Sequence, residues 1–346
     1  MSERRIFLDE GLGETRGVVT LDGAPERLFV RRDGDDPRLQ AGARLAGVVA
    51  SLEPALSMAF LDLGRGAEAI LQFKPEAKPA RGEVVEVEIR GEPRRGKLAV
   101  ARLLGAAEGP PRLLAEAPGF AVTLKALVPG ATLVTGAPAR VMADEAEAEA
   151  LEVLHALPGG GTLAIEPTRA LTAVDVDLGQ RKGGDSKRVT RAANLAAIAQ
   201  TARLLRLKSL GGIVAIDLVG RGHDAKALSA AARIAFAPDN PGVAIEPIGR
   251  FGVLQLSLPR RTRPLAEVLC GLDGTLTDES LALRLIRRLE AEAAALPGAQ
   301  LVARCAPPVA AAAAPLAQRL AARIGARFEV SPDPVRPPNS FDVGAP

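Results

Sequence analysis

The spacing of apolar residues along this chain changes from a strand period to a mixture of strand and helix periods. Over residues 85–90, valine and isoleucine alternate with glutamate and arginine, which is typical of a half-buried strand. The runs 15–20 and 27–32, joined by a turn at 21–23, predict a hairpin. Glycine-bounded apolar runs then predict a small barrel, with strands at 45–50, 58–63, 68–71, 84–90 and 97–102.

The second half of the chain has the rhythm of a mixed α/β fold. The nearly all-apolar runs 170–176 and 213–219 predict two buried strands, and the helical period over 188–208 predicts a long helix between them. This order predicts parallel strands in one sheet. Further helices are predicted at 143–157, 225–236, 280–295 and 309–324, and further strands at 243–248, 253–258, 301–304 and 327–330. Residues 106–141 and 332–338 show few regular patterns.

Two acidic residues end the predicted buried strands, where a lone charge is costly. Asp175 and Asp217 each follow an apolar run. The carboxyl ends of strands in an open α/β sheet border the crevice that binds ligands, so the two carboxylates are expected to converge there. A divalent cation such as Mg²⁺ relieves their mutual repulsion, and Asp177 can add a ligand from the same side. The alternative is that these aspartates only form turns or helix caps.

Composition excludes several classes of protein. Of 346 residues, 47% are apolar, which excludes disorder along the whole chain. Cys270 and Cys305 are the only cysteines, which excludes a disulfide scaffold and predicts a reducing, cytoplasmic setting. No uninterrupted apolar run reaches the roughly 18 residues of a membrane span, and the first ten residues lack a secretory signal, so we expect no membrane contact.

Basic residues gather next to the two aspartates, although the net charge of the chain is only +3. Residues 179–210 contain one acid, Asp185, and eight basic residues: Arg181, Lys182, Lys187, Arg188, Arg191, Arg203, Arg206 and Lys208. A second group without acids consists of Arg250, Arg260, Arg261 and Arg263. These groups predict contacts with phosphates, and the alternative is a solvated helix face.

Several segments together resemble the ribonuclease E/G family. The catalytic region of that family is similar to ALTAVDVDLGQRKGGD at 170–185, NLAAIAQTARLLRLKSLGGIVAIDLV at 194–219 and IGRFGVLQLS at 248–257. The barrel segment 47–71 looks like its S1-type RNA-binding module, and ESLALRLIRRLEAEA at 279–293 resembles the start of its small C-terminal domain.

The resemblance implies a domain plan and an activity. The plan is an S1-type OB barrel (41–105) inserted in a split RNase H-like domain (1–40 and 106–165), then a DNase I-like catalytic domain (166–268) and a small α/β domain (269–346). The activity is Mg²⁺-dependent cleavage of single-stranded RNA, with Mn²⁺ able to replace Mg²⁺, in rRNA or tRNA processing or RNA decay.

The resemblance also assigns catalytic roles. Asp175 and Asp217 fall on the two metal-binding aspartates of the family. Asp177 falls where the family usually has an asparagine that orients the ligands, so the site carries one more negative charge here.

A wider set of residues is expected to bind RNA. Phe60 matches an aromatic of the S1 module that contacts RNA, while Ile70 replaces the second such aromatic. Arg95 lies where the family has a basic residue facing the substrate, and Arg250 matches a family arginine associated with the RNA 5′ end. The basic loop and helix complete the expected set with Arg181, Lys182, Arg188 and Arg191.

Two departures from the family change the expectation. Residues 106–141 are too few to contain the 5′-monophosphate sensor subdomain, which predicts little preference for monophosphorylated ends. The zinc-binding CPxC motif is replaced by VLCGLDGTL, with Asp273 in place of the second cysteine, so we expect no structural zinc and a monomer or a zinc-independent oligomer.

Two other functions stay open. The reduced architecture is compatible with a catalytically weak or inactive RNA-binding protein of the same family. A DNA nuclease or a phosphatase can use the same pair of carboxylates, although the S1-like segment favours RNA.

Overall fold

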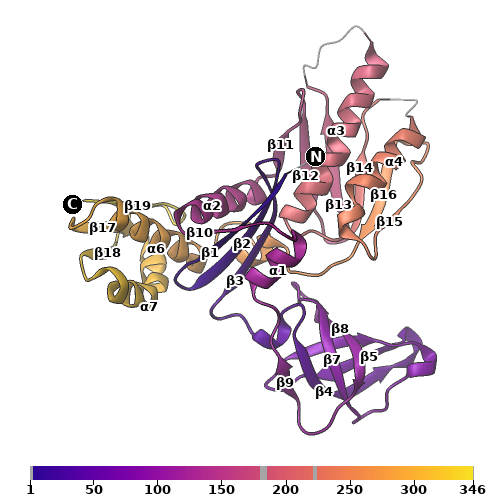
Figure 1. Cartoon of the computed structure of the whole chain (residues 1–346), viewed down its shortest axis with the longest axis horizontal. Coiled ribbons are helices and arrows are strands. Elements are labelled where there is room, and N and C mark those ends of the chain that lie inside the picture. The colour runs from indigo at the N-terminus through magenta and orange to yellow at the C-terminus, as the bar shows by residue number, and fades with distance from the viewer. Residues whose placement is uncertain (1–2, 180–184, 221–223, 346) are drawn as a thin grey trace.

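The computed structural model describes residues 3–179, 185–220 and 224–345, whose helices and strands form a mixed α/β protein (Figure 1). A four-stranded sheet lies in the centre, and a barrel, a six-stranded sheet and a C-terminal unit surround it. Within these ranges no helix is long and apolar enough to cross a membrane.

The barrel has the strands that the alternating pattern predicts. Its strands pair in the order β5, β6, β8, β7 and β4, and pairing between β4 and β5 closes it. Val85, Val87 and Ile89 are buried inside, as their spacing predicts. Its elements are β4 (Arg44–Glu53), β5 (Met58–Asp62), β6 (Glu68–Gln72), β7 (Val84–Gly91) and β8 (Ala99–Ala106), with β9 (Arg112–Ala115) paired on the outside of β4.

The central sheet is covered by a helix on each face. It has the order β10-β1-β2-β3, with β1 (Arg4–Glu10), β2 (Glu14–Leu21), β3 (Ala24–Arg32) and β10 (Leu133–Thr135). Val19 packs in a core with α1 (Phe120–Leu127), whereas Val18 packs in the core that contains α2 (Ala137–Leu151). That second core continues into the six-stranded sheet, so the two sheets share one hydrophobic interior.

The six-stranded sheet has the order β11-β12-β13-β14-β16-β15. Its strands are β11 (Leu154–Ala156), β12 (Thr162–Pro167), β13 (Thr172–Asp177), β14 (Gly212–Asp217), β15 (Ala244–Ile245) and β16 (Val253–Leu258). Helices α3 (Ser186–Leu207) and α4 (Ala225–Ala235) share its core. The domain boundary expected between residues 165 and 166 falls inside β12, which pairs with β13 along its whole length.

The C-terminal unit follows the short helix α5 (Leu265–Leu269) and has a core of its own. It contains α6 (Asp278–Ala295), β17 (Leu301–Cys305), α7 (Pro307–Ile324), β18 (Phe328–Pro332) and β19 (Phe341–Gly344). Short 3₁₀ turns elsewhere lie at Pro37–Leu39, Pro54–Leu56, Pro75–Ala77 and Ala237–Asp239.

Three sequence-based expectations are wrong in detail. The helix expected at 143–157 begins at Ala137 and ends at Leu151, because residues 154–156 pair with β12 instead. The strand expected at 243–248 is confined to Ala244–Ile245. Residues 106–141, which show few patterns, form β9, α1 and β10, since pairing with β4 and β1 and packing on the central sheet supply what local propensity lacks.

A buried cluster of charges joins β2, α2 and α6. Glu147 of α2 accepts hydrogen bonds from Arg16 at 3.0 Å, from Arg284 at 2.6 Å and from Arg287 at 3.2 Å. Arg16 is fully buried and also contacts Asp9 at 2.6 Å. Although burial acts to raise it, the attraction of Arg287, Arg284 and Arg16 lowers the pKa of the Glu147 carboxyl. The cluster therefore holds the C-terminal unit against the central sheet through ion pairs that exclude water.

Candidate active site on the six-stranded sheet

The two predicted aspartates are cross-strand neighbours. Strands β13 and β14 run parallel, and their register places Asp175 directly beside Asp217. Because adjacent strands lie about 4.8 Å apart, the two side chains start from neighbouring points on one surface. The expected convergence of residues 42 positions apart in the chain therefore occurs in the fold.

The pair lies on the open face of the sheet. Val174, Val176 and Ile216 point into the core shared with α3 and α4, whereas the alternating positions Asp175 and Asp217 are exposed. Asp217 is the last residue of β14, but β13 continues for two residues beyond Asp175. Both carboxylates thus stand exposed near the carboxyl edge of the sheet.

Asp177 is occupied by a local turn. Its side chain is exposed, and its Oδ1 atom accepts a hydrogen bond from the backbone N–H of Gly179 at 2.9 Å. Its register partner is Thr162 of β12, on the side away from β14. Asp177 therefore lies on the same face of β13 as Asp175, two residues further along the strand, with one of its oxygens held by this turn.

A buried asparagine fixes the backbone just beyond Asp217. Asn194 of α3 donates from Nδ2 to the carbonyl of Val219 at 3.0 Å, and its Oδ1 atom accepts from the Val219 N–H at 3.1 Å. This two-way contact ties the end of β14 to the helix that crosses behind it. Sequence reasoning missed Asn194, although a polar residue in the apolar stripe of a helix was a visible signal.

The donor set around the pair fits a hard cation with few protein ligands. In the described part of the chain, no group of three or more His, Cys, Asp or Glu side chains is arranged to hold a metal ion. Two exposed neighbouring carboxylates match Mg²⁺, which commonly takes one or two carboxylates and fills its other positions with water and phosphate oxygens.

The basic helix divides into an exposed half and a structural half. Arg188 and Arg191 near the start of α3 are exposed, and Arg191 contacts Asp224 at 3.4 Å. Arg181 and Lys182 lie outside the described residues. Lys187 is also exposed. The remaining three cations of the predicted basic stretch are used inside the protein, so the phosphate contact expected of them is wrong: Arg203 pairs with Glu149, Arg206 with Glu26 and Asp239, and Lys208 with the carbonyls of Ala150 and Glu152.

An arginine and a phenylalanine lie in the segment that leads into β16, next to the end of β14. The guanidinium of Arg250 lies 4.8 Å from the ring centre of Phe251, which is 79% exposed. Gly252 accepts the N–H of Leu218, and Val253 is the register partner of Asp217. Arg250 therefore lies near the aspartate pair. Sequence reasoning did not single out Phe251 as a surface on which a base can stack.

The barrel presents an apolar row across three strands. Phe60 of β5 is paired with Ile70 of β6, and Ile70 is paired with Val100 of β8. All three are partly or fully exposed, while their sequence neighbours Ala59, Leu61 and Leu71 are buried in the barrel. The expected partnership of Phe60 with position 70 is thus present, with an aliphatic residue in the second place.

Arg95 contacts the region around α5 rather than projecting freely. Its Nη2 atom donates to the carbonyls of Cys270 at 2.6 Å and Gly271 at 2.8 Å, and its backbone N–H donates to Glu267 at 2.7 Å. The Cys270 thiol lies beside this contact, and burial raises its pKa. Arg95 thereby fixes the barrel against the rest of the protein.

A basic cleft lies between the turn that joins β7 to β8 in the barrel and the edge of the six-stranded sheet at which β13 begins. Its volume is about 520 Å³, and Arg94, Lys97, Arg169 and Arg260 line it together with Arg95. The acidic residue that lines it, Glu267, already accepts the N–H of Arg95. Thr172, at the base of β13, also lines the cleft, three residues below Asp175, or about 10 Å along the strand.

Comparison with known proteins matches the region that carries these aspartates. Residues 139–261 match the model of the Ribonuclease E/G family. The chain is 36% identical over 147 residues to ribonuclease E of Escherichia coli K12 and 37% identical over 147 residues to ribonuclease E of Haemophilus influenzae. It is 30% identical over 113 residues to a chloroplastic ribonuclease E/G-like protein of Arabidopsis thaliana.

These matches cover a part of each protein. The aligned segments make up 40%, 40% and 31% of this chain, in the same order. They make up 14%, 16% and 11% of the three relatives.

Proposed function

Because residues 139–261 match the model of the Ribonuclease E/G family, we propose that this chain is an endoribonuclease that cuts single-stranded RNA on the open face of β13 and β14. The observation that carries the proposal is the register of the sheet, which sets Asp175 beside Asp217 on an exposed surface. In the same proposal the barrel is an S1-type module, the central sheet is RNase H-like and the six-stranded sheet is DNase I-like.

Asp175 and Asp217 would hold Mg²⁺, or Mn²⁺ in its place, and Asp177 would orient the site from its turn. When bound, such an ion activates a water molecule and offsets charge at the scissile phosphate. The protein positions the reacting groups. Asn194 would hold the end of β14 in place, and Arg250 with Phe251 would offer a cation and an aromatic ring to the nucleotide beside Asp217. Arg188 and Arg191 add positive charge at the start of α3.

The path of the RNA follows from the surfaces on either side. The apolar row Phe60, Ile70 and Val100 offers a stacking surface on the barrel, and the basic cleft lies between the barrel and the sheet. A strand bound to both would reach the aspartates with its phosphates held by arginine and lysine. Such binding depends on phosphate charge and stacking more than on base sequence.

In this proposal the apolar row on the barrel contributes measurably to the affinity for RNA. Phe60→Ala is expected to weaken binding of a single-stranded RNA by about 1–3 kcal/mol, since stacking of one base on an aromatic ring is worth that much. Ile70→Phe, which adds a second ring beside the first, should tighten binding. Fluorescence anisotropy measures both, with the exposed Val335→Ala as control. Equal affinity for the wild type and Phe60→Ala would place the RNA elsewhere.

The basic cleft is tested by salt dependence. Lys97→Gln and Arg169→Gln should each make the fall of log affinity with log salt concentration less steep by about 0.7, because each removes one phosphate contact on a single strand. Arg233→Gln, at an exposed arginine on α4, makes the same charge change away from the cleft. If all three variants keep the wild-type slope, the cleft does not hold the RNA backbone.

A further inference from the structure

A second pocket lies where the barrel, the central sheet and the six-stranded sheet meet. It consists of two adjoining hollows of about 270 and 310 Å³, here called the junction pocket. Both hollows are lined by Phe29, Arg31, Glu92, Phe120, Ser209 and Thr262. Ser209 and Thr262 also line the basic cleft, so the junction pocket lies on the other side of these two residues.

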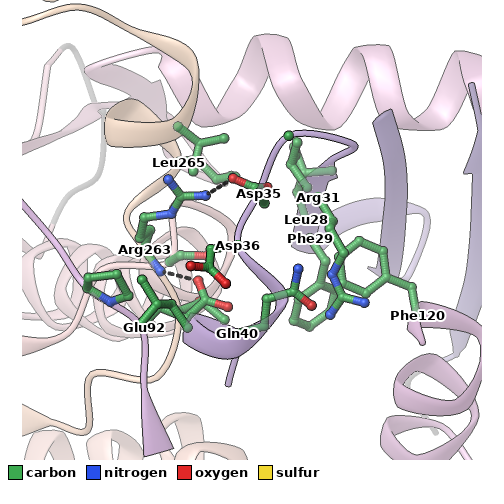
Figure 2. A pocket seen from close by; sticks show the side chains of 17 residues that line it. Leu28, Phe29, Arg31, Asp35, Asp36, Gln40, Glu92, Phe120, Arg263 and Leu265 are labelled. Atoms are coloured by element: carbon green, nitrogen blue, oxygen red, sulfur yellow. Dashed lines mark hydrogen bonds and ion pairs between the residues drawn. The ribbon is translucent and has the colours of Figure 1, made fainter. Parts of the chain in front are cut away.

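Two phenyl rings and an arginine form one wall of the junction pocket (Figure 2). The ring centres of Phe29 and Phe120 are 5.7 Å apart, and the Arg31 guanidinium lies 4.7 Å from the centre of the Phe120 ring. Across the described residues the side chain of Arg31 makes no hydrogen bond or ion pair, so its guanidinium N–H groups are free for a ligand. Burial lowers the pKa of this guanidinium, and the attraction of Glu92 and Asp35 offsets that effect only in part.

The carboxylates of the pocket already have partners. Asp35 pairs with Arg263 at 2.7 Å, and Asp36 pairs with Arg38 at 2.6 Å. Glu92 accepts the backbone N–H of Arg263 at 3.0 Å, as Figure 2 shows. An incoming ligand would therefore find the N–H groups of Arg31 unpaired.

Two further side chains supply what a nucleotide needs. Gln40 lines the first hollow together with Phe29 and Arg31, and its amide can both donate to and accept from the edge of a base. In the second hollow, Arg261 donates to the backbone carbonyls of Asp239 at 3.1 Å and Pro241 at 3.2 Å, and within the described chain it pairs with no carboxylate. Its charge is left for a phosphate.

We propose that the junction pocket binds one nucleotide, with the base against Arg31 and the phenyl rings, its edge at Gln40, and the phosphate at Arg261. Flat guanidinium and phenyl groups stack on any base, while an amide and a cation recognise its edge and its phosphate. The site is distinct from the aspartate pair. Ser209 and Leu210 precede β14, whereas Asp217 ends it, about 20 Å away along the strand.

Calorimetric titration of the full chain with AMP tests this site without any cleavage. We expect saturable binding of one AMP per chain, weakened about tenfold or more by Arg31→Gln, because the substitution removes the guanidinium on which the base stacks, and such stacking is worth about 1–3 kcal/mol. Gln40→Ala should weaken it about threefold, and Arg233→Gln should leave it unchanged. Inorganic phosphate alone should bind at least about tenfold more weakly than AMP, since it lacks the base.

Several outcomes would overturn the site. These are no heat of binding with about 1 mM AMP, equal AMP affinity in the wild type and in both folded pocket variants, or inorganic phosphate binding as tightly as AMP. Thermal melts followed by circular dichroism establish that the variants fold, and Gln40→Ala is the safer of the two because Gln40 ends a 3₁₀ turn whereas Arg31 lies within β3. Asp217→Asn should keep full AMP affinity, so failure of the nuclease proposal and failure of this one are distinguishable.

The nucleotide can belong to an RNA strand or be free in solution, and a ten-residue oligoadenylate separates the two. If the site holds part of the RNA, AMP competes with the oligomer and Arg31→Gln weakens both. If it holds a free nucleotide, Arg31→Gln weakens AMP alone. An Arg31→Gln variant that binds both ligands like the wild type contradicts both forms of the proposal.

Discussion

Asp217→Asn is expected to abolish Mg²⁺-dependent cleavage of single-stranded RNA while RNA binding persists. The substitution keeps the shape of the side chain at the end of β14 but removes one of two neighbouring negative charges. Metal-assisted catalysis supplies several kcal/mol, so the rate should fall by about 10³-fold or more. Binding of the RNA should stay equal or become slightly tighter, since a charge that repels phosphate is lost.

A same-face control makes this result specific. Glu166 of β12 is exposed on the open face, opposite Ala173, and Glu166→Gln changes the charge there by the same amount. Its cleavage rate should remain within about a factor of two or three of the wild type. Rates are measured with a fluorescent single-stranded RNA, with Mg²⁺ and with a chelator. Full activity in Asp217→Asn, or equal loss in Glu166→Gln, would remove the aspartate pair from the mechanism.

Glu147→Gln is expected to destabilise the protein more than any surface substitution. Glu147 is buried and accepts hydrogen bonds from Arg16, Arg284 and Arg287. Removing its charge takes the carboxylate from Arg284 and leaves Arg16 and Arg287 with their remaining acidic partners only; breaking such buried pairs costs about 3–5 kcal/mol. The melting temperature should fall by about 4–7 °C, as differential scanning calorimetry would show. Glu292→Gln, at the more exposed pair with Arg288 on α6, should cost less than about 1 kcal/mol.

The pH dependence of this effect follows from the lowered pKa of Glu147. A carboxyl group whose pKa is lower in the folded than in the unfolded state stabilises the protein above its ordinary value of 4.5. That contribution is lost as the pH falls through the folded-state pKa. The difference in melting temperature between wild type and Glu147→Gln should therefore be full at pH 7 and shrink below about pH 4.5. A difference that grows on acidification would contradict the ion-pair account.

Glu14 of the same cluster provides a contrast. Burial raises the pKa of this carboxyl despite the attraction of Arg287 and Arg16. Its charged form is therefore disfavoured in the folded protein, and Glu14→Gln should destabilise less than Glu147→Gln at pH 7. Equal losses of stability in the two variants would contradict this difference between the two carboxyl groups.

The elements of the candidate site were predictable because their signals are local. The apolar runs before Asp175 and Asp217 and the helical period between them predict a strand, a helix and a parallel strand. Parallel strands in that order bring the two aspartates to the same side of one sheet. Residue spacing alone was therefore enough to place two distant carboxylates together, and the alternation of 85–90 was enough to predict the interior of the barrel.

The tertiary structure decided whether each charged side chain pairs within the protein or stays free for a ligand. Arg203, Arg206 and Lys208 look like a basic helix face in the sequence, but the fold places acidic side chains and carbonyls against them. Arg31 and Phe120, far apart in the chain, meet only when α1 packs on the central sheet. Periodicity depends on a few consecutive residues and predicts which way a side chain faces. Whether a charge stays free for a ligand depends on which groups the packed fold sets opposite it, and no local pattern contains that information.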